Sequence, residues 1–392
     1  MNQIPKWILH ELSFDGLIRT DSSAILDLEE LMSIKDGIVG DDLQLFFCDT
    51  TASRIRIARN VKSNEHVIIW DENYLKFLRR CISVVFDTGP EEHKKESSLG
   101  FCFARTAAER LLVPKPEMAM AAMEMVKLFY YKFGISKEIQ IRGENNVKFL
   151  GYNKIIRWWI LFHEIGHYLY SNGHTDLYNS IGKKIDSSLE LFKQRDDWPV
   201  SEKTSRLREL GVIKFYSERR DDICGEIVNL PTREEVWCDF FAIEQVLLKV
   251  FNEAINPSFI YPSIMLAYYA SSTLKHTEIF FNQKIRSERY IDELERSMRQ
   301  MTTRTDLRMM HLLREGLQIY GQVGLNREDI LKWVDYTELL RFAEAEGKIS
   351  GLLNSIEYRE ECFSSIDRLI ELKSNIEMKA LYGELRQELG WA

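Results

Sequence analysis

Hydrophobic and polar positions between residues 43 and 71 follow the short periods of β-strands. An apolar run fills residues 43–50, Arg and Ile alternate at 54–57, and a second apolar run fills 66–71. Alternation with a period of two is typical of a half-exposed strand, and a short apolar run is typical of a buried one. Residues 139–151 predict a β-hairpin, with its turn at 143–146.

Most of the remaining chain has the longer period of helices. Helices are predicted over residues 72–86, near 116–133 and over 153–171, and nearly every segment of the C-terminal third has a helical pattern. The 153–171 helix is apolar on almost every face, which is typical of a central, buried helix. Asn153 is a suitable N-cap, and an Asn-Gly pair after the helix supplies a left-handed stop.

Composition agrees with long helices. The 20 Gly and 8 Pro residues are about 7% of the chain, against an average near 12%. We therefore expect an α+β fold that is predominantly helical. At roughly 100–200 residues per domain, we expect an N-terminal α/β region at 1–90, a core at 91–255 with a charged insertion at 175–230, and a helical C-terminal region at 256–392.

Charge and cysteine content narrow the class of protein. The formal net charge of −8 lacks the basic footprint of a nucleic-acid-binding protein. The 6 cysteines are scattered without a CxxC pair, so we expect reduced thiols and a cytoplasmic location. The first residues lack the pattern of a signal peptide, and the longest apolar runs fall short of the ~20 residues that span a bilayer. We expect no nucleic-acid or membrane partner.

The candidate chemistry is concentrated in an HExxH motif, His163-Glu164-Ile165-Gly166-His167, on the predicted central helix. Residues four apart share a helix face, so both imidazoles can bind one Zn²⁺ ion. Glu164 can then act as a general base on the zinc-bound water. With 8 His and 60 acidic residues in the chain, about 0.025 such matches are expected by chance at most. The motif therefore predicts a catalytic zinc site.

A catalytic zinc ion needs a third protein ligand, and three candidates follow the motif. His174 does not fit the HExxHxxGxxH spacing and is more typical of a solvated loop histidine. Glu235 lies four residues before Asp239, which would accept a hydrogen bond from a liganding imidazole. Two alternatives stay open, because Thr232-x-x-Glu235 is also a capping box and the neighbouring Glu234 also offers a carboxylate.

The segments HEIGH and EVWCDFFA resemble the gluzincin superfamily of zinc metallopeptidases, in which HExxH is followed on a later helix by ExxxD. Cys238 stands where that pattern commonly has Ala. The resemblance covers only these two short segments and implies a zincin-like metallopeptidase core. It also implies zinc bound by His163, His167 and Glu235, with Glu164 as the base and Asp239 supporting a ligand.

A narrower similarity lies in the layout of the chain. An HExxH motif near residue 160, after a mixed α/β region, is similar to the Lit-type phage-exclusion peptidases, which cut a host translation factor during infection. That similarity implies a regulated protease of antiviral defence. Gluzincins also use a Tyr, His or Arg to stabilise the oxyanion, and Tyr268, Tyr269 and His276 are candidates that the sequence does not separate. His311 is expected on the surface of an amphipathic helix.

We therefore expect an intracellular zinc-dependent endopeptidase that hydrolyses a peptide bond of a protein or peptide substrate. The C-terminal helices are expected to recognise that substrate or to restrain the enzyme. The alternative is a non-catalytic helical interaction protein with a structural zinc site, closed by a fourth protein ligand such as His174. Glu164 favours the enzyme, because a structural site needs no base.

Overall fold

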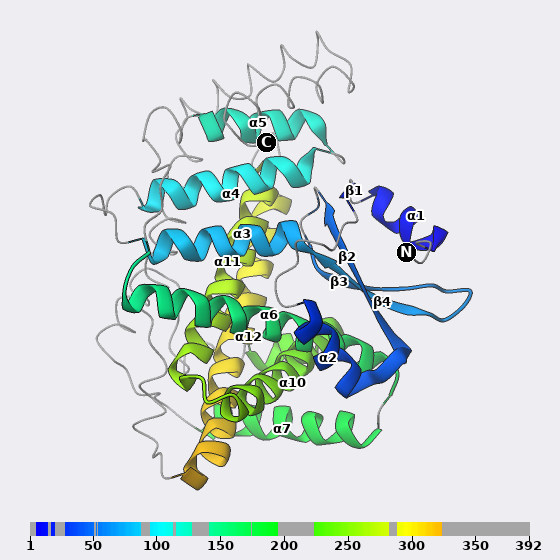
Figure 1. The fold of residues 1–392 in the computed structure, drawn as a ribbon, viewed down its shortest axis with the longest axis vertical. Helices are drawn as coiled ribbons and strands as arrows, with labels where there is room; N and C mark the ends of the chain where they lie inside the picture. The colour runs from blue at the N-terminus through cyan, green and yellow to red at the C-terminus, as the bar shows by residue number, and fades with distance from the viewer. Residues whose placement is uncertain are drawn as a thin grey trace.

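The computed structural model describes residues 5–14, 17–19, 28–50, 52, 54–87, 95–112, 115–127, 141–173, 175–194, 223–281 and 288–323. Within these ranges the protein is mostly helical with one small sheet, so the expected α+β, predominantly helical class is confirmed. The domain boundaries at residues 90 and 255 stay predictions. Figure 1 shows the helices gathered on one side of the sheet and α1 on the other.

The longer helices are α1 (Lys6–Phe14), α2 (Leu28–Val39), α3 (Glu72–Val85), α4 (Lys95–Leu111), α5 (Pro116–Lys127), α6 (Glu144–Ser171), α7 (Thr175–Gln194), α10 (Leu230–Asn252), α11 (Ile260–Phe281) and α12 (Glu288–Tyr320). Short 3₁₀ helices are η1 (Gly40–Asp42), η4 (Pro257–Phe259) and η5 (Gly321–Val323). The strands are β1 (Leu17–Arg19), β2 (Leu43–Thr50), β3 (Arg56–Arg59) and β4 (His66–Asp71).

The sheet has the strand order β1-β2-β4-β3. β4 pairs in parallel with β2 and antiparallel with β3, so β3 forms an edge of the sheet. Side chains alternate between the faces of a strand. In β4, Val67 and Ile69 pack in a cluster with α1, while Ile68 and Trp70 belong to the large helical core. Burial on both faces explains why β4 is a continuous apolar run.

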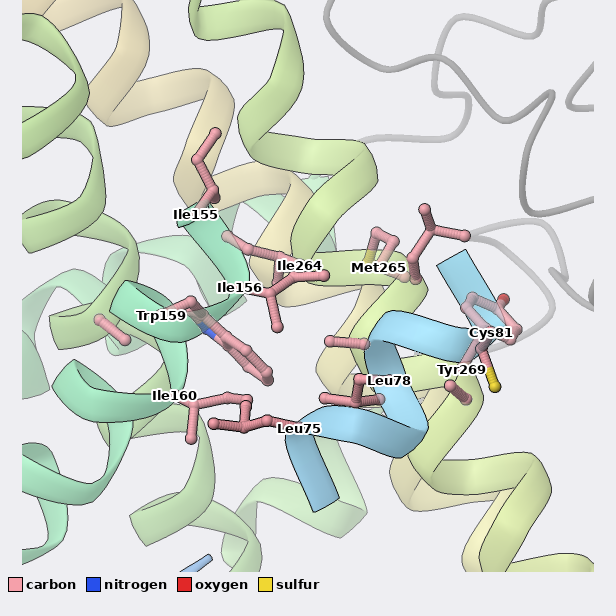
Figure 2. Packing of buried hydrophobic residues seen from close by; sticks show 14 of the residues in the cluster. Leu75, Leu78, Cys81, Ile155, Ile156, Trp159, Ile160, Ile264, Met265 and Tyr269 are labelled. Atoms are coloured by element: carbon pink, nitrogen blue, oxygen red, sulfur yellow. The ribbon is translucent and has the colours of Figure 1, made fainter. Parts of the chain in front are cut away.

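Helix α6 runs through the centre of the helical core and is buried on most of its faces. Figure 2 shows its apolar side chains directed toward residues of α3 and α11. The labelled residues are Ile155, Ile156, Trp159 and Ile160 of α6, Leu75, Leu78 and Cys81 of α3, and Ile264, Met265 and Tyr269 of α11. Full burial of each such side chain contributes about 1.5–3 kcal/mol, so this packing holds α6 firmly in place.

The predicted hairpin at 139–151 is wrong for the part that the structure describes. Residues 144–151 are the first two turns of α6, and Gly143 is the N-cap with a φ of 56°. Phe149 and Tyr152 are buried at helical spacing with Ile156, so tertiary burial favours a helix here. Asn153 lies inside the helix, where its Nδ2 donates to the carbonyl oxygen of Phe149 at 2.7 Å. The stop is as predicted, with Asn172 as C-cap and Gly173 at a φ of 66°.

Several other features predicted from the sequence can be compared with the structure. The strands at 43–50 and 66–71 have the predicted bounds, and the helix expected at 72–86 is α3. The charged stretch at 175–230 begins with the helix α7, and 195–222 lie outside the described residues. The five cysteines in the described ranges are free thiols. In the described part of the chain, every helix is too short or too polar to cross a membrane.

Helices α6 and α10 approach closely at Gly166. A Cβ atom at this position would lie 3.1 Å from the Cα of Cys238 and 3.2 Å from its Cβ. A small residue on each helix, Gly166 and Cys238, therefore permits the approach. The contact lies between the two motif segments, so it sets the distance between HExxH and ExxxD.

Substituting Gly166→Val should lower the free energy of unfolding by about 1–3 kcal/mol, because the added carbons overpack this contact. Gly182→Val in α7 is the matched control, since a Cβ there meets nothing within 4 Å. Val is a slightly better helix former than Gly, so the control should change stability by less than about 1 kcal/mol. Urea denaturation measures both variants, and equal stabilities would contradict the close approach.

Candidate metal centre

His163 and His167 lie on the face of α6 that meets α10. Their ring centroids are 4.9 Å apart, as expected for residues separated by one helical turn. The Nε2 atom of His163 is 3.4 Å from Glu235 Oε2, and the Nε2 atom of His167 is 3.5 Å from Glu235 Oε1. One ligand atom from each of the three residues lies within 4.8 Å of the others. The structure therefore brings together a group that can hold a metal ion.

Two further carboxylates of α10 contact the other nitrogen of each imidazole. Asp239 Oδ1 is 3.1 Å from His163 Nδ1, and Glu234 Oε1 is 2.9 Å from His167 Nδ1. An acceptor at Nδ1 places the proton there and leaves the lone pair of Nε2 available for a metal ion. Both Nε2 atoms face Glu235. The geometry thus places Glu235 in the group that could hold a metal ion and Glu234 beside the far nitrogen of His167.

The capping-box alternative for Glu235 is wrong. Helix α10 begins at Leu230, with Asn229 as its N-cap and Pro231 in the first turn. Thr232 lies inside the helix, and its buried hydroxyl has no hydrogen-bond partner among the described residues. Pro is favoured at the start of a helix because it has no N–H to satisfy. The helix therefore starts earlier than the Thr-x-x-Glu pattern suggests.

Glu164 points from α6 toward the sheet. It is buried, and the backbone N–H of Ile57, in the edge strand β3, donates a hydrogen bond to it. Burial raises the pKa of Glu164, and the neighbouring His167 and His163 lower it in part. A carboxylate with a raised pKa is suited to accept and return a proton near neutral pH.

Two arginines of α12 complete the charge balance around Asp239. Arg304 donates from Nε to Asp239 Oδ2 at 2.9 Å, and Arg308 donates from Nη2 to Asp239 Oδ1 at 2.7 Å. Arg304 Nη2 is also 2.9 Å from Glu235 Oε2. The guanidinium groups lie over the ring of Tyr268, with Arg308 Cζ 3.8 Å from its centroid. Arg308 and Asp239 are each 1% exposed in their side chains, so this ion pair is fully buried.

The ionisation of the site follows from these contacts. Burial raises the pKa of Asp239, but Arg304 and Arg308 outweigh it and hold the pKa well below its usual range. Burial also opposes the shift at Glu235, yet Arg304 and His163 lower its pKa. Burial lowers the pKa of His163, while Asp239 and Glu235 raise it, with a net value of about 9. The carboxylates therefore strongly favour positive charge between the two helices.

The sequence did not single out Arg304 and Arg308. They follow Asp239 by 65 and 69 residues, in a helix rich in charged side chains. The sequence holds only an indirect signal for these arginines: a buried Asp-Glu pair requires cations nearby. Only the packing of α12 against α10 identifies which of the chain's many Arg residues supply them.

The other residues that the sequence suggested for oxyanion stabilisation or metal binding lie in different surroundings. Tyr268 is half-buried beside the arginine pair, and its electrostatic partners include Asp239 and Glu235. Tyr269 is 2% exposed and belongs to the apolar core. His174 and the side chain of His276 lie outside the described residues.

The surface position expected for His311 is wrong. This residue was expected on a helix surface, but it is fully buried and stacks on Phe240, with ring centroids 3.8 Å apart. Its helix α12 packs against α10 on this side, so the histidine lies on a buried face.

Comparison of the chain with protein-family models, with curated proteins and with solved structures finds no match. The site is therefore interpreted from its own geometry.

Because the ion pairs of Asp239 are buried, two isosteric Asp→Asn substitutions should differ greatly in their effect on the free energy of unfolding. Asp239→Asn should lower the free energy of unfolding by about 3–5 kcal/mol, because it leaves the buried Arg308 without its counter-charge. Asp186→Asn removes the partner of Arg233 in a pair with side chains 30% and 61% exposed, so it should cost at most about 1 kcal/mol. Urea denaturation in the presence of a chelator measures both, and similar values would contradict the role of Asp239.

Proposed function

We propose that the chain is a zinc-dependent endopeptidase with a zincin-like core. The observation that carries this proposal is the convergence of two imidazole Nε2 atoms and the Glu235 carboxylate beside a buried Glu164. Two His and one Glu are the ligand set of many catalytic zinc sites, which keep a position open for water. The donor chemistry of this group therefore fits zinc, and His163, His167 and Glu235 would hold it.

Glu164 is proposed as the general base and acid. Bound zinc would polarise the scissile carbonyl and lower the pKa of an attacking water molecule. Glu164 follows His163 directly on α6, is buried, and has a pKa raised by burial. It accepts the proton of the water and returns it to the leaving nitrogen of the peptide bond. A purely structural zinc site would not require a buried carboxylate at this position.

The edge strand β3 is proposed to align the substrate. An extended peptide can add to an exposed sheet edge through backbone hydrogen bonds. β3 lies at the edge of the sheet, and its Ile57 N–H donates a hydrogen bond to Glu164. A peptide paired with β3 would therefore pass beside the proposed base. This supports a polypeptide substrate.

Tyr268 is proposed as the oxyanion-stabilising residue. It is half-buried near Glu235, and burial raises the pKa of its hydroxyl, so the proton is retained for donation. Tyr269 is less suitable, because it is enclosed in the core. The proposal extends to a cytoplasmic enzyme, in keeping with the free thiols of the described cysteines, and to a regulated role in antiviral defence.

Zinc analysis tests the ligand set. His163→Ala and Glu235→Ala should each lose one equivalent of tightly bound zinc, because each removes a proposed ligand. Glu234→Ala should keep that equivalent with an affinity about 10–100-fold weaker, because it removes only the contact to His167 Nδ1. Elemental analysis after dialysis against a chelator series measures both effects. Loss of zinc in Glu234→Ala with retention in Glu235→Ala would reverse the assignment.

Glu164→Gln tests the reaction. The variant should bind zinc as the wild type does, but its cleavage rate should fall by about 10²–10⁴-fold, because amide nitrogen cannot replace the carboxylate base. Cleavage of an unstructured random-sequence peptide library, analysed by mass spectrometry, supplies the rates. Zinc-dependent cleavage of equal rate in the two proteins would exclude Glu164 as the base.

A further inference from the structure

A second group of ionisable side chains lies where α7, α10 and α12 meet. Glu244 belongs to α10, and His311 and Glu315 belong to α12. One ligand atom from each lies within 4.8 Å of the others. Glu244 is nine residues beyond Glu235, about 14 Å along α10, so this group is separate from the HExxH site.

The polar atoms of Glu244 and His311 are less well satisfied than those of Glu315, whose two carboxylate oxygens accept hydrogen bonds from Lys184 and Arg314. His311 is fully buried, and neither of its ring nitrogens makes a hydrogen bond within the described residues. Glu244 Oε1 is also buried without one. The two groups nevertheless approach each other, with His311 Nε2 3.0 Å from Glu244 Oε1. Buried polar atoms normally have partners, so this arrangement requires an explanation.

A shared metal ion accounts for the geometry. Ligand atoms about 2.0–2.2 Å from one metal ion are themselves about 3–3.5 Å apart, with their lone pairs directed at the ion rather than at each other. The 3.0 Å separation of His311 Nε2 and Glu244 Oε1 falls in that range.

The position also favours a cation electrostatically. The ammonium nitrogen of Lys184 lies 2.9 Å from Glu244 Oε1 and 3.1 Å from Glu315 Oε2. The side chain of Lys184 is 27% exposed, so it has room to turn toward solvent. Two carboxylates would then be left to balance a divalent ion. Arg314, 3.2 Å from the other oxygen of Glu315, stays in place on the outer side.

We propose that Glu244, His311 and Glu315 form a second site, which binds a divalent transition-metal ion in exchange for the Lys184 ammonium group. One imidazole and two carboxylates suit zinc or manganese. An ion at this place would join α12 to α10. Because Arg304 and Arg308 lie on the same helix as His311, it would also hold them against Asp239.

Zinc binding to the full chain tests this site in a His163→Ala/His167→Ala background, which removes the first site. The background variant should still bind about one equivalent of zinc, measured by competition with a chromophoric chelator. Glu315→Gln in that background should weaken binding by about 10–100-fold. Lys184→Met should strengthen it by about tenfold, because the competing positive charge is removed. Lys249→Met is the matched control, because Lys249 is an ion-paired lysine of α10 outside this group. It should leave the zinc affinity unchanged.

Two outcomes would overturn the second site. One is a background variant that binds no zinc. The other is weak binding that neither Glu315→Gln nor Lys184→Met alters, which would show adventitious binding and leave a plain ion-pair cluster. Because the background lacks the HExxH ligands, either outcome is independent of the proposed peptidase. Circular dichroism of each variant confirms that the chain is folded before zinc is added.

Discussion

The Asp239 carboxylate is enclosed by three helices, and each of them must dock correctly for its charge to be balanced. It belongs to α10, lies 3.1 Å from His163 Nδ1 of α6, and forms ion pairs with Arg304 and Arg308 of α12. Removing a charge from water costs several kcal/mol unless its partners replace the lost solvation. Asp239 therefore fixes the relative positions of α6, α10 and α12, and the Glu235 carboxylate and the two imidazoles, which could together hold a metal ion, converge as a consequence.

Packing and electrostatics act together at this point. Gly166 and Cys238 set the separation of α6 and α10, and the carboxylates of α10 orient imidazoles that the contact has already brought near. Buried ion pairs contribute little net stability compared with apolar packing, but they tolerate few alternative arrangements. The apolar core thus supplies the stability, while the charged groups specify the geometry at its centre.

Helix α12 carries much of the buried charge of the described protein. Arg304 and Arg308 serve the first group of ligands, and His311 and Glu315 belong to the second. A helix with so many buried polar side chains would be costly if its only role were to cover the core. Its charge pattern instead links the C-terminal part of the chain to the candidate site.

The sequence by itself determined the strands at 43–50 and 66–71, the central buried helix with its Asn-Gly stop, and the HExxH and ExxxD residues, because these depend on local period, capping and spacing. It failed at residues 144–151, since the burial of Phe149 and Tyr152 against distant helices decided between strand and helix. Only the tertiary structure decided the different positions of Glu234 and Glu235 beside the two imidazoles, the contacts of Arg304 and Arg308, and the burial of His311. Each depends on which faces of α6, α10 and α12 meet, and that is a property of packing between segments far apart in the chain.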